Sequence, residues 1–379
     1  MKSRFLTTLS ALILGCCTFA ACGGDSSEEQ APAVSIQTSE SALSFGSEAS
    51  QKTFDVTVNH GWTAFSDDEW VTVSQSTTAA GKGTVTVGVK ENTTYVERTG
   101  TVTVKAGTER ATVTVKQAAA TRPEPGDEIT CPVEGYSLVW NDEFNEGSEL
   151  NSRHWRHEVQ GAGWVNNELQ NYVNHTSPGG RLVTELKDGA LQIHCFKENG
   201  KIYSGRVYAH ENQGWKYGYF EASIKLPKGK GTWPAFWMMP VGNDWSTNPW
   251  PKCGEIDIME EVGVVPNEVS SSIHTQDYNH TKGTQKTHAM TIQDAEGAFH
   301  TYGLLWTADE ITTYVDGKVQ LNVQKSVLGS SHNQWPFSEY PFYVIFNLAW
   351  GGSWGGMQGV DESALPVTME VDYIRVFQK

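Results

Sequence analysis

Apolar and polar side chains alternate with a period of two residues along most of the chain, from Val34 to Lys379. Segments such as TFDVTVNHGWTAF, GYFEASIKLP, EITTYVDGKVQLNV and TMEVDYIRVF show this pattern, and Gly, Pro, Asn or Asp residues separate them. Such alternation is typical of half-buried strands, and no segment keeps the 3.6-residue period of an amphipathic helix. The sequence therefore predicts an all-β fold.

The strand-like segments fall into two groups. Residues 119–130, AATRPEPGDEIT, are Pro-rich, charged and without periodicity, which is typical of a linker. Residues 34–118 before it predict a small Ig-like β-sandwich, and residues 131–379 after it predict a larger, curved β-sandwich. The 379 residues include 14 Trp, which is enough for a sizeable core in two domains.

The charge of the chain excludes one class of partner. Lys and Arg total 28 against 44 Asp and Glu, and the formal net charge is −16. Binding to nucleic-acid phosphates needs a basic face, so we expect a neutral substrate and no nucleic acid. We also expect a monomer.

The N-terminus has the pattern of a targeting segment. A positively charged start, Met1–Arg4, precedes the uncharged run Phe5–Ala21, which is too short to span a bilayer comfortably. The motif TFAAC, ending at Cys22, resembles the lipobox of bacterial lipoproteins, which implies removal of residues 1–21 and lipidation of Cys22. Free secretion after cleavage near residue 21 is one alternative, and the competing motif ILGC, ending at Cys16, is another.

Residues 22–33 form an acidic tether in this interpretation. The stretch Asp25–Glu29 resembles the surface-export signal of some Gram-negative outer-membrane lipoproteins. The expected location is therefore the outer membrane, with a lipid anchor and exposure at the cell surface.

Three cysteines follow Cys22, namely Cys131, Cys195 and Cys253. One bridge is compatible with this odd count, but the spacing does not choose the pair, so we expect no disulfide framework. Cys and His spacing typical of metal sites is absent from the sequence.

The segment GEIDIME, residues 254–260, carries three acids whose spacing does not fit a regular strand. Glu255 and Asp257 share one face of a strand, whereas Glu260, five positions after Glu255, belongs on the other. A single β-bulge near residue 258 or 259 adds one residue and brings all three acids onto one face. The sequence therefore predicts a bulged strand here.

Carboxyl groups that converge on one face can cleave a glycosidic bond. Retaining glycosidases need two carboxyls about 5 to 5.5 Å apart, one as nucleophile and one as acid/base, and the long side chains of Glu255 and Glu260 can converge. Asp257 between them can hold a proton or hydrogen-bond Glu255. The alternative is a solvated acidic face, which the apolar residues around the acids disfavour.

The segment Tyr136–Lys379 resembles glycoside hydrolase family 16. The motifs that carry the resemblance are LVWNDEFN, GWVNNELQNYV, SGRV, YGYFEASIKLPKGKGTWPAFWMMP, GEIDIME, SSIHT, FHTYGLLWTADEITTYVDGK, NLAWGGSWGG and VDYIRVFQ. The resemblance implies a concanavalin A-like jelly roll with Glu255 as nucleophile, Glu260 as acid/base and Asp257 as assisting acid. The bulged strand and WPAFWMMP resemble the laminarinase-type branch, which implies cleavage of internal bonds in β-1,3 or mixed β-1,3/1,4 glucans without a catalytic cofactor.

The same resemblance implies residues that bind the sugar chain. Sugar rings stack on aromatic rings, so the stacking candidates are Trp233, Trp237 and Trp250, although each fits a hydrophobic core as well. The resemblance places four further residues in the cleft, namely Asn166, Arg206, His274 and Asn347.

Family members often hold one structural calcium ion away from the catalytic acids. The matching residues are Glu143, the carbonyl of Gly189 and Asp372, an oxygen set suited to Ca²⁺. Ordinary surface acids are the alternative for Glu143 and Asp372.

Residues 34–118 resemble a BACON domain. The resemblance rests on Trp62, Trp70, Asn92 and Arg98 and on the closing segment VTVKQA. Such domains are often attached to carbohydrate-active enzymes. The two tryptophans fit core packing as well as a sugar site, and we favour a core and spacer role.

Two classes of function fit these features. The first is a surface-tethered endo-β-glucanase, and the second is a glycan-binding lipoprotein without catalysis. Intact Glu255 and Glu260 favour the enzyme, because a binding protein has no need for two converging carboxyls. Within the enzyme class, a galactan-cleaving relative of the agarase or porphyranase type is the alternative.

Overall fold

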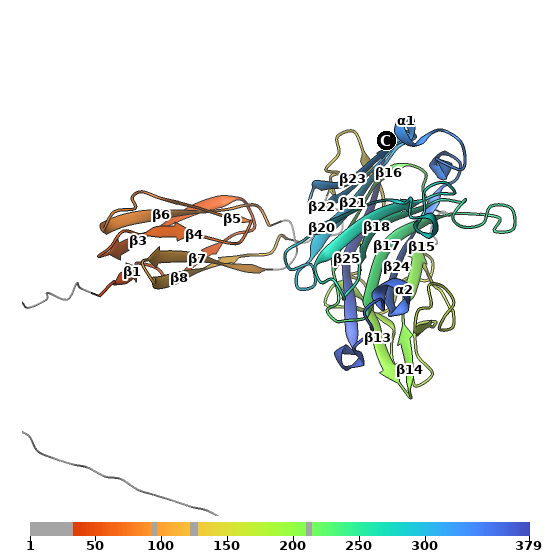
Figure 1. The fold of residues 1–379 in the computed structure, drawn as a ribbon, viewed down its shortest axis with the longest axis horizontal. Helices are drawn as coiled ribbons and strands as arrows, with labels where there is room; N and C mark the ends of the chain where they lie inside the picture. Colours follow the sequence, from red (N-terminus) through yellow and green to blue (C-terminus); the bar gives the residue numbers. More distant parts are fainter. Residues whose placement is uncertain (1–32, 93–96, 122–127, 210–213) are drawn as a thin grey trace, which may run out of the picture. The chain divides into compact units, whose positions relative to one another are not determined.

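The computed structural model describes residues 33–92, 97–121, 128–209 and 214–379 (Figure 1). Within them strands predominate, as the alternation predicts, and the α- and 3-10 helices are single turns: α1 Lys325–Leu328, α2 Gly352–Gly355, η2 His280–Lys282, η3 Pro336–Ser338 and η4 Glu362–Ala364. The predicted signal segment, Cys22 and residues 122–127 of the linker lie outside the described residues. No helix in the described part is long and apolar enough to cross a bilayer.

The N-terminal group of strands forms two four-stranded sheets. One sheet has the order β1 (Ile36–Thr38), β3 (Ser50–Val58), β6 (Gly81–Val89), β5 (Val71–Gln75), and the other has the order β2 (Ala42–Phe45), β8 (Glu109–Gln117), β7 (Arg98–Ala106), β4 (Thr63–Phe65). Buried side chains alternate along β7 and β8, where Val102, Val104, Val113 and Val115 are fully buried. This is the predicted small β-sandwich.

Residues of the BACON-like pattern support this sandwich from within. Trp62 is only 2% exposed, so it belongs to the core, whereas Trp70 is half-buried. The Arg98 guanidinium donates from Nε to Gln117 Oε1 at 2.9 Å and from Nη2 to two main-chain carbonyls. The core role predicted for Trp62 is confirmed.

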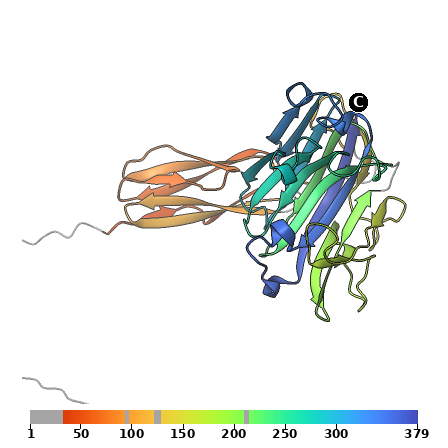
Figure 2. The same cartoon turned by 45° about the vertical axis from the view of Figure 1, so that its right-hand side comes forward.

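The C-terminal group of strands forms a seven-stranded and a ten-stranded sheet (Figure 1 and Figure 2). The seven-stranded sheet has the order β10 (Trp155–His157), β15 (Arg206–Ala209), β24 (Phe342–Trp350), β17 (Thr232–Pro240), β18 (Glu255–Glu261), β19 (Glu268–His274), β20 (Lys286–Thr291). The ten-stranded sheet has the order β11 (Gln170–Tyr172), β14 (Lys201–Ser204), β13 (Ala190–Glu198), β25 (Val367–Gln378), β16 (Gly218–Lys225), β21 (His300–Trp306), β22 (Glu310–Val315), β23 (Lys318–Gln324), with β12 (Thr184–Lys187) beside β13 and β9 (Ser137–Asp142) beside β25.

One hydrophobic core joins these two sheets. Phe236 and Phe346 of the seven-stranded sheet and Phe220 and Leu304 of the ten-stranded sheet are fully buried in the same cluster. The domain is therefore a sandwich, and one face of the seven-stranded sheet points away from the core. The three cysteines in the described residues are free thiols.

Candidate active site

Strand β18 contains the bulge that the sequence predicts. On the neighbouring strand β17, the consecutive residues Phe236 and Trp237 lie opposite Met259 and Asp257, so Ile258 has no counterpart. The pairing of β18 with β19 shifts at the same place. Ile258 and Met259 are consecutive, yet both are fully buried in the core between the sheets. The extra residue restores the alternation for the acid that follows.

Two acids of the bulged strand receive hydrogen bonds from tryptophans on the outer face of the sheet. Trp250 donates its indole N–H to Glu255 Oε2 at 2.8 Å. Trp233 donates its indole N–H to Glu260 Oε1 at 3.0 Å. Because the indole N–H can only donate, each tryptophan stabilises the ionised form of its carboxyl.

The third acid lies between the other two and is the most enclosed. Asp257 is 3% exposed, and its Oδ2 lies 3.2 Å from Nε2 of His274 on β19. One donor atom from each of Glu255, Asp257 and His274 lies within 4.8 Å of the others. The structure thus brings Glu255, Asp257 and the predicted His274 into one cluster, and the charge of Glu260 acts on Asp257 from beside it.

The environment raises the pKa of every carboxyl in this cluster. Burial, with the charge of Asp257 as the next cause, raises the pKa of Glu255 to about 8. Burial also raises the pKa of Glu260 to about 7, against the opposing hydrogen bond from Trp233. The pKa of Asp257 is raised well above its usual value by burial and then by the charge of Glu260. Carboxyls this close do not all ionise together, so one can donate a proton while another attacks as a carboxylate.

A second network of predicted residues lies on strands β15, β17 and β24. Trp237 donates its indole N–H to Asn347 Oδ1 at 2.7 Å, and Asn347 Nδ2 donates to the hydroxyl of Tyr172 at 3.2 Å. The Arg206 guanidinium carbon lies 4.6 Å from the ring centre of Trp237 and 5.0 Å from that of Trp164. Neither Tyr172 nor Trp164 was among the predicted site residues.

Glu168 completes this network and was also missed. Its carboxylate is 7% exposed and accepts hydrogen bonds from Gln170 at 2.7 Å, Asn166 at 3.3 Å and Tyr172 at 3.4 Å. Burial is the main cause of the raised pKa of Glu260, and the charge of Glu168 adds to it. No sequence period marks Glu168: Asn167 and Asn171 are polar as well, and strand β11 begins only at Gln170.

The predicted calcium donors adjoin three neighbouring strands of the ten-stranded sheet. Glu143 follows β9, Gly189 precedes β13, and Asp372 lies in β25. The Glu143 carboxylate forms a two-point ion pair with Arg375, at 2.9 Å from Nε and 2.8 Å from Nη2. A carboxylate held by a guanidinium does not fit the role of calcium ligand, so a cation here would depend on the other oxygens. Calcium binding beside these three strands stays a prediction.

Comparison with known proteins identifies the family of the catalytic region. A family model described as glycosyl hydrolases family 16 matches residues 170–375, with the candidate acids inside the match. The chain belongs to glycosyl hydrolases family 16. A second family, BACON, described as a putative binding domain, matches residues 60–118.

Similar proteins agree with this assignment. The beta-glucanase of Rhodothermus marinus is 39% identical over 251 residues, which cover 64% of this chain and 85% of that protein. The glucan endo-1,3-beta-glucosidase of Cryptopygus antarcticus is 34% identical over 255 residues, which cover 63% of this chain and 90% of that protein. Among solved structures, a mutant of SCLam has a TM-score of 0.60 and 41% identity, and the match covers 67% of this chain and 98% of that one. SCLam is a non-specific endo-beta-1,3(4)-glucanase, and this mutant was co-crystallised with 1,3-beta-D-cellotriosyl-glucose.

Proposed function

We propose that this family 16 enzyme is a retaining endo-β-glucanase that hydrolyses internal bonds of laminarin-type β-1,3 glucans and of mixed-linkage β-1,3/1,4 glucans. The observation that carries the proposal is the bulged strand β18, which sets Glu255, Asp257 and Glu260 on one face with tryptophan donors on two of them. The named activities of the relatives, beta-glucanase and glucan endo-1,3-beta-glucosidase, support the choice of substrate.

In the proposed reaction, Glu255 attacks the anomeric carbon while Glu260 protonates the departing glycosidic oxygen. The glycosyl ester on Glu255 is then hydrolysed by a water molecule, and Glu260 takes the proton of that water. The hydrogen bond from Trp250 stabilises Glu255 each time it leaves as a carboxylate. A proton held on Asp257 removes the charge that, after burial, raises the pKa of Glu255, so that Glu255 can ionise and attack as a carboxylate.

Half-buried tryptophans supply the surface for the sugar rings. Trp233, Trp237 and Trp250 are each partly exposed, and each uses its indole N–H within the site. A fixed indole leaves its apolar ring available for stacking without loss of rotamer freedom on binding. This arrangement supports stacking of a neutral glucan.

We also propose that the enzyme is monomeric and works at the cell surface of a Gram-negative bacterium, anchored in the outer membrane through lipidated Cys22. The support is the TFAAC motif and the acidic tether. Cys22→Ala is expected to move the protein from the membrane fraction to the soluble fraction. Unchanged membrane partition would contradict the anchor.

A digest of laminarin, mixed-linkage glucan and agarose by the full chain tests the proposed substrate. We expect reducing ends from laminarin and from mixed-linkage glucan, with internal cleavage seen as early loss of viscosity. Release from agarose alone would favour the galactan-cleaving alternative. Binding of laminarin without any release would favour the non-catalytic one.

A further inference from the structure

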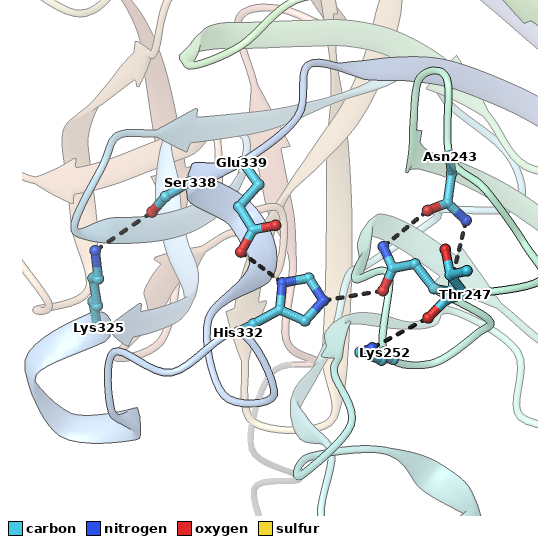
Figure 3. A network of polar contacts seen from close by, with 8 residues as sticks. Asn243, Thr247, Lys252, Lys325, His332, Ser338 and Glu339 are labelled. Carbon is cyan, nitrogen blue, oxygen red and sulfur yellow. Dashed lines mark hydrogen bonds and ion pairs between the residues drawn. The ribbon is translucent and has the colours of Figure 1, made fainter.

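The loop that carries Trp250 is held by hydrogen bonds outside the acid cluster. This loop, residues 241–254, connects β17 to β18, and Asn248 lies two residues before Trp250. Figure 3 shows His332 between Glu339 on one side and the loop with Asn243 and Thr247 on the other. The loop is thereby tied to residues 331–339, which lie far from it in the sequence.

The orientation of each amide in this network follows from one main-chain carbonyl. Asn243 Nδ2 donates to the carbonyl oxygen of Asn248 at 2.9 Å, and a carbonyl can only accept. The Oδ1 of Asn243 therefore faces the Nδ2 of Asn248, at 2.8 Å. This leaves Asn248 Oδ1 facing Nε2 of His332, at 3.0 Å. An amide oxygen accepts, so Nε2 of His332 must donate.

The other ring nitrogen of His332 also meets an acceptor. Its Nδ1 lies 2.6 Å from Oε1 of Glu339, a carboxylate oxygen. Neutral imidazole donates from one nitrogen only, so two acceptors are satisfied together only when both nitrogens carry a proton. With Glu339 as a carboxylate, the network therefore requires a charged His332.

We propose that doubly protonated His332 is a positioning residue that fastens the loop and so holds Trp250 in hydrogen-bonding distance of Glu255. With the Nδ1 proton kept by Glu339, loss of the Nε2 proton removes the bond to Asn248, two residues from Trp250. The inference rests on the proposed catalytic role of Glu255.

Four charged residues of the described part surround this clasp of Asn248, His332 and Glu339: Glu339 itself, Lys252, Lys325 and Asp244, whose carboxylate accepts from Ser246 and Thr247. Glu339 faces the imidazole directly. Lys252, on the loop itself, donates to the carbonyl of Thr247 at 3.2 Å, and Lys325 lies 3.5 Å from the hydroxyl of Ser338. Because the lysines point to neutral oxygens, Glu339 is the charged group that contacts the imidazole.

His332→Gln tests the clasp, because glutamine keeps a donor but does not titrate. We expect kcat/KM on laminarin to fall about tenfold near pH 6, since a small displacement of a site group has a large kinetic cost. Near pH 9 the native enzyme has lost its own clasp, so the two enzymes should become equal. His300→Gln is the matched control, because His300, on β21 of the other sheet, also pairs with a carboxylate. Its Nδ1 lies 2.8 Å from Oδ2 of Asp316. This control is expected to change nothing at either pH.

A ratio between native enzyme and His332→Gln that does not change with pH would overturn the inference, because a merely structural histidine gives that result. Nitrogen-15 NMR of histidine-labelled native enzyme gives a second readout that needs no activity. We expect both ring nitrogens of His332 to carry hydrogen-bonded protons near pH 6, and a single protonated nitrogen would also overturn the clasp. If glucan is not hydrolysed at all, the proposed function fails while this NMR result still decides the state of His332.

Discussion

Strand β18 carries acids on both of its faces, and the two groups differ in what surrounds them. The outer group, Glu255, Asp257 and Glu260, lies on the face away from the core and receives indole hydrogen bonds. The inner residue, Glu261, is fully buried and is accompanied by Glu296. Glu261 Oε1 accepts a hydrogen bond from the Asn267 main-chain N–H at 3.2 Å, and the Glu261 and Glu296 carboxyls interact with each other.

Both groups have raised pKa values, so that property alone does not mark a catalytic site. Burial and then the charge of Glu296 raise the pKa of Glu261 to about 9, further than for Glu255 and Glu260. Glu261 has a donor as well, so a donor does not separate the two groups; the outer acids differ because Glu255 and Glu260 are partly exposed. Access therefore distinguishes a reactive carboxyl from a buried one.

Among the variants that test this comparison, Glu255→Gln is expected to lose the most activity. Loss of a covalent nucleophile should lower kcat on laminarin by about 10⁵-fold or more, while glucan binding remains because the tryptophans are untouched. Reducing-end release and a laminarin affinity gel measure the two properties. Activity within tenfold of the native enzyme would show that the outer group is not the reactive one.

Glu260→Ala should fail in a way that depends on the leaving group. A natural glucan needs protonation of its leaving oxygen, so its hydrolysis should fall by about 10²- to 10⁴-fold. An activated aryl glucoside needs little protonation and should retain far more of its first-step rate. Equal losses on both substrates would contradict the acid/base assignment, and azide products distinguish the roles, with a β-glycosyl azide expected for this variant.

Glu168→Gln tests the carboxylate that the sequence interpretation missed. The change removes a charge near Glu260, so the pKa of Glu260 should fall and the alkaline limb of the pH–rate profile should move to lower pH. Weaker bonds to its three partners should also lower kcat/KM about fivefold. Glu221→Gln is the control, because Glu221 accepts from two tyrosine hydroxyls on the other sheet. If the pH–rate profile shifts for Glu221→Gln but not for Glu168→Gln, the result contradicts this account.

Glu261→Gln should change stability and leave activity intact. A carboxyl with a raised folded-state pKa binds more protons when folded, so its presence destabilises the native enzyme increasingly as pH rises from about 4.3 towards about 9. The variant should therefore melt about 4 °C above the native enzyme near pH 9, with little difference near pH 4. Loss of glucanase activity in this variant would erase the distinction between the two faces.

The sequence predicted what depends on local pattern and missed what depends on distant strands. The alternation predicts the all-β fold, and the parity of GEIDIME predicts the bulge at residues 258 and 259. The bond between Asn347 and Tyr172 joins residues 175 positions apart, and the pair of Glu143 with Arg375 joins residues 232 apart. Sheet order decides such contacts, and no local spacing encodes them.

NMR of the first product formed from laminarin tests the shared-face geometry most directly. Because the bulge sets two carboxyls on one face, the account predicts a covalent intermediate and a newly formed reducing end that appears first as the β-anomer, before mutarotation. An α-anomer as the first product would mean direct attack by water, and it would contradict the assignment of Glu255 as a nucleophile.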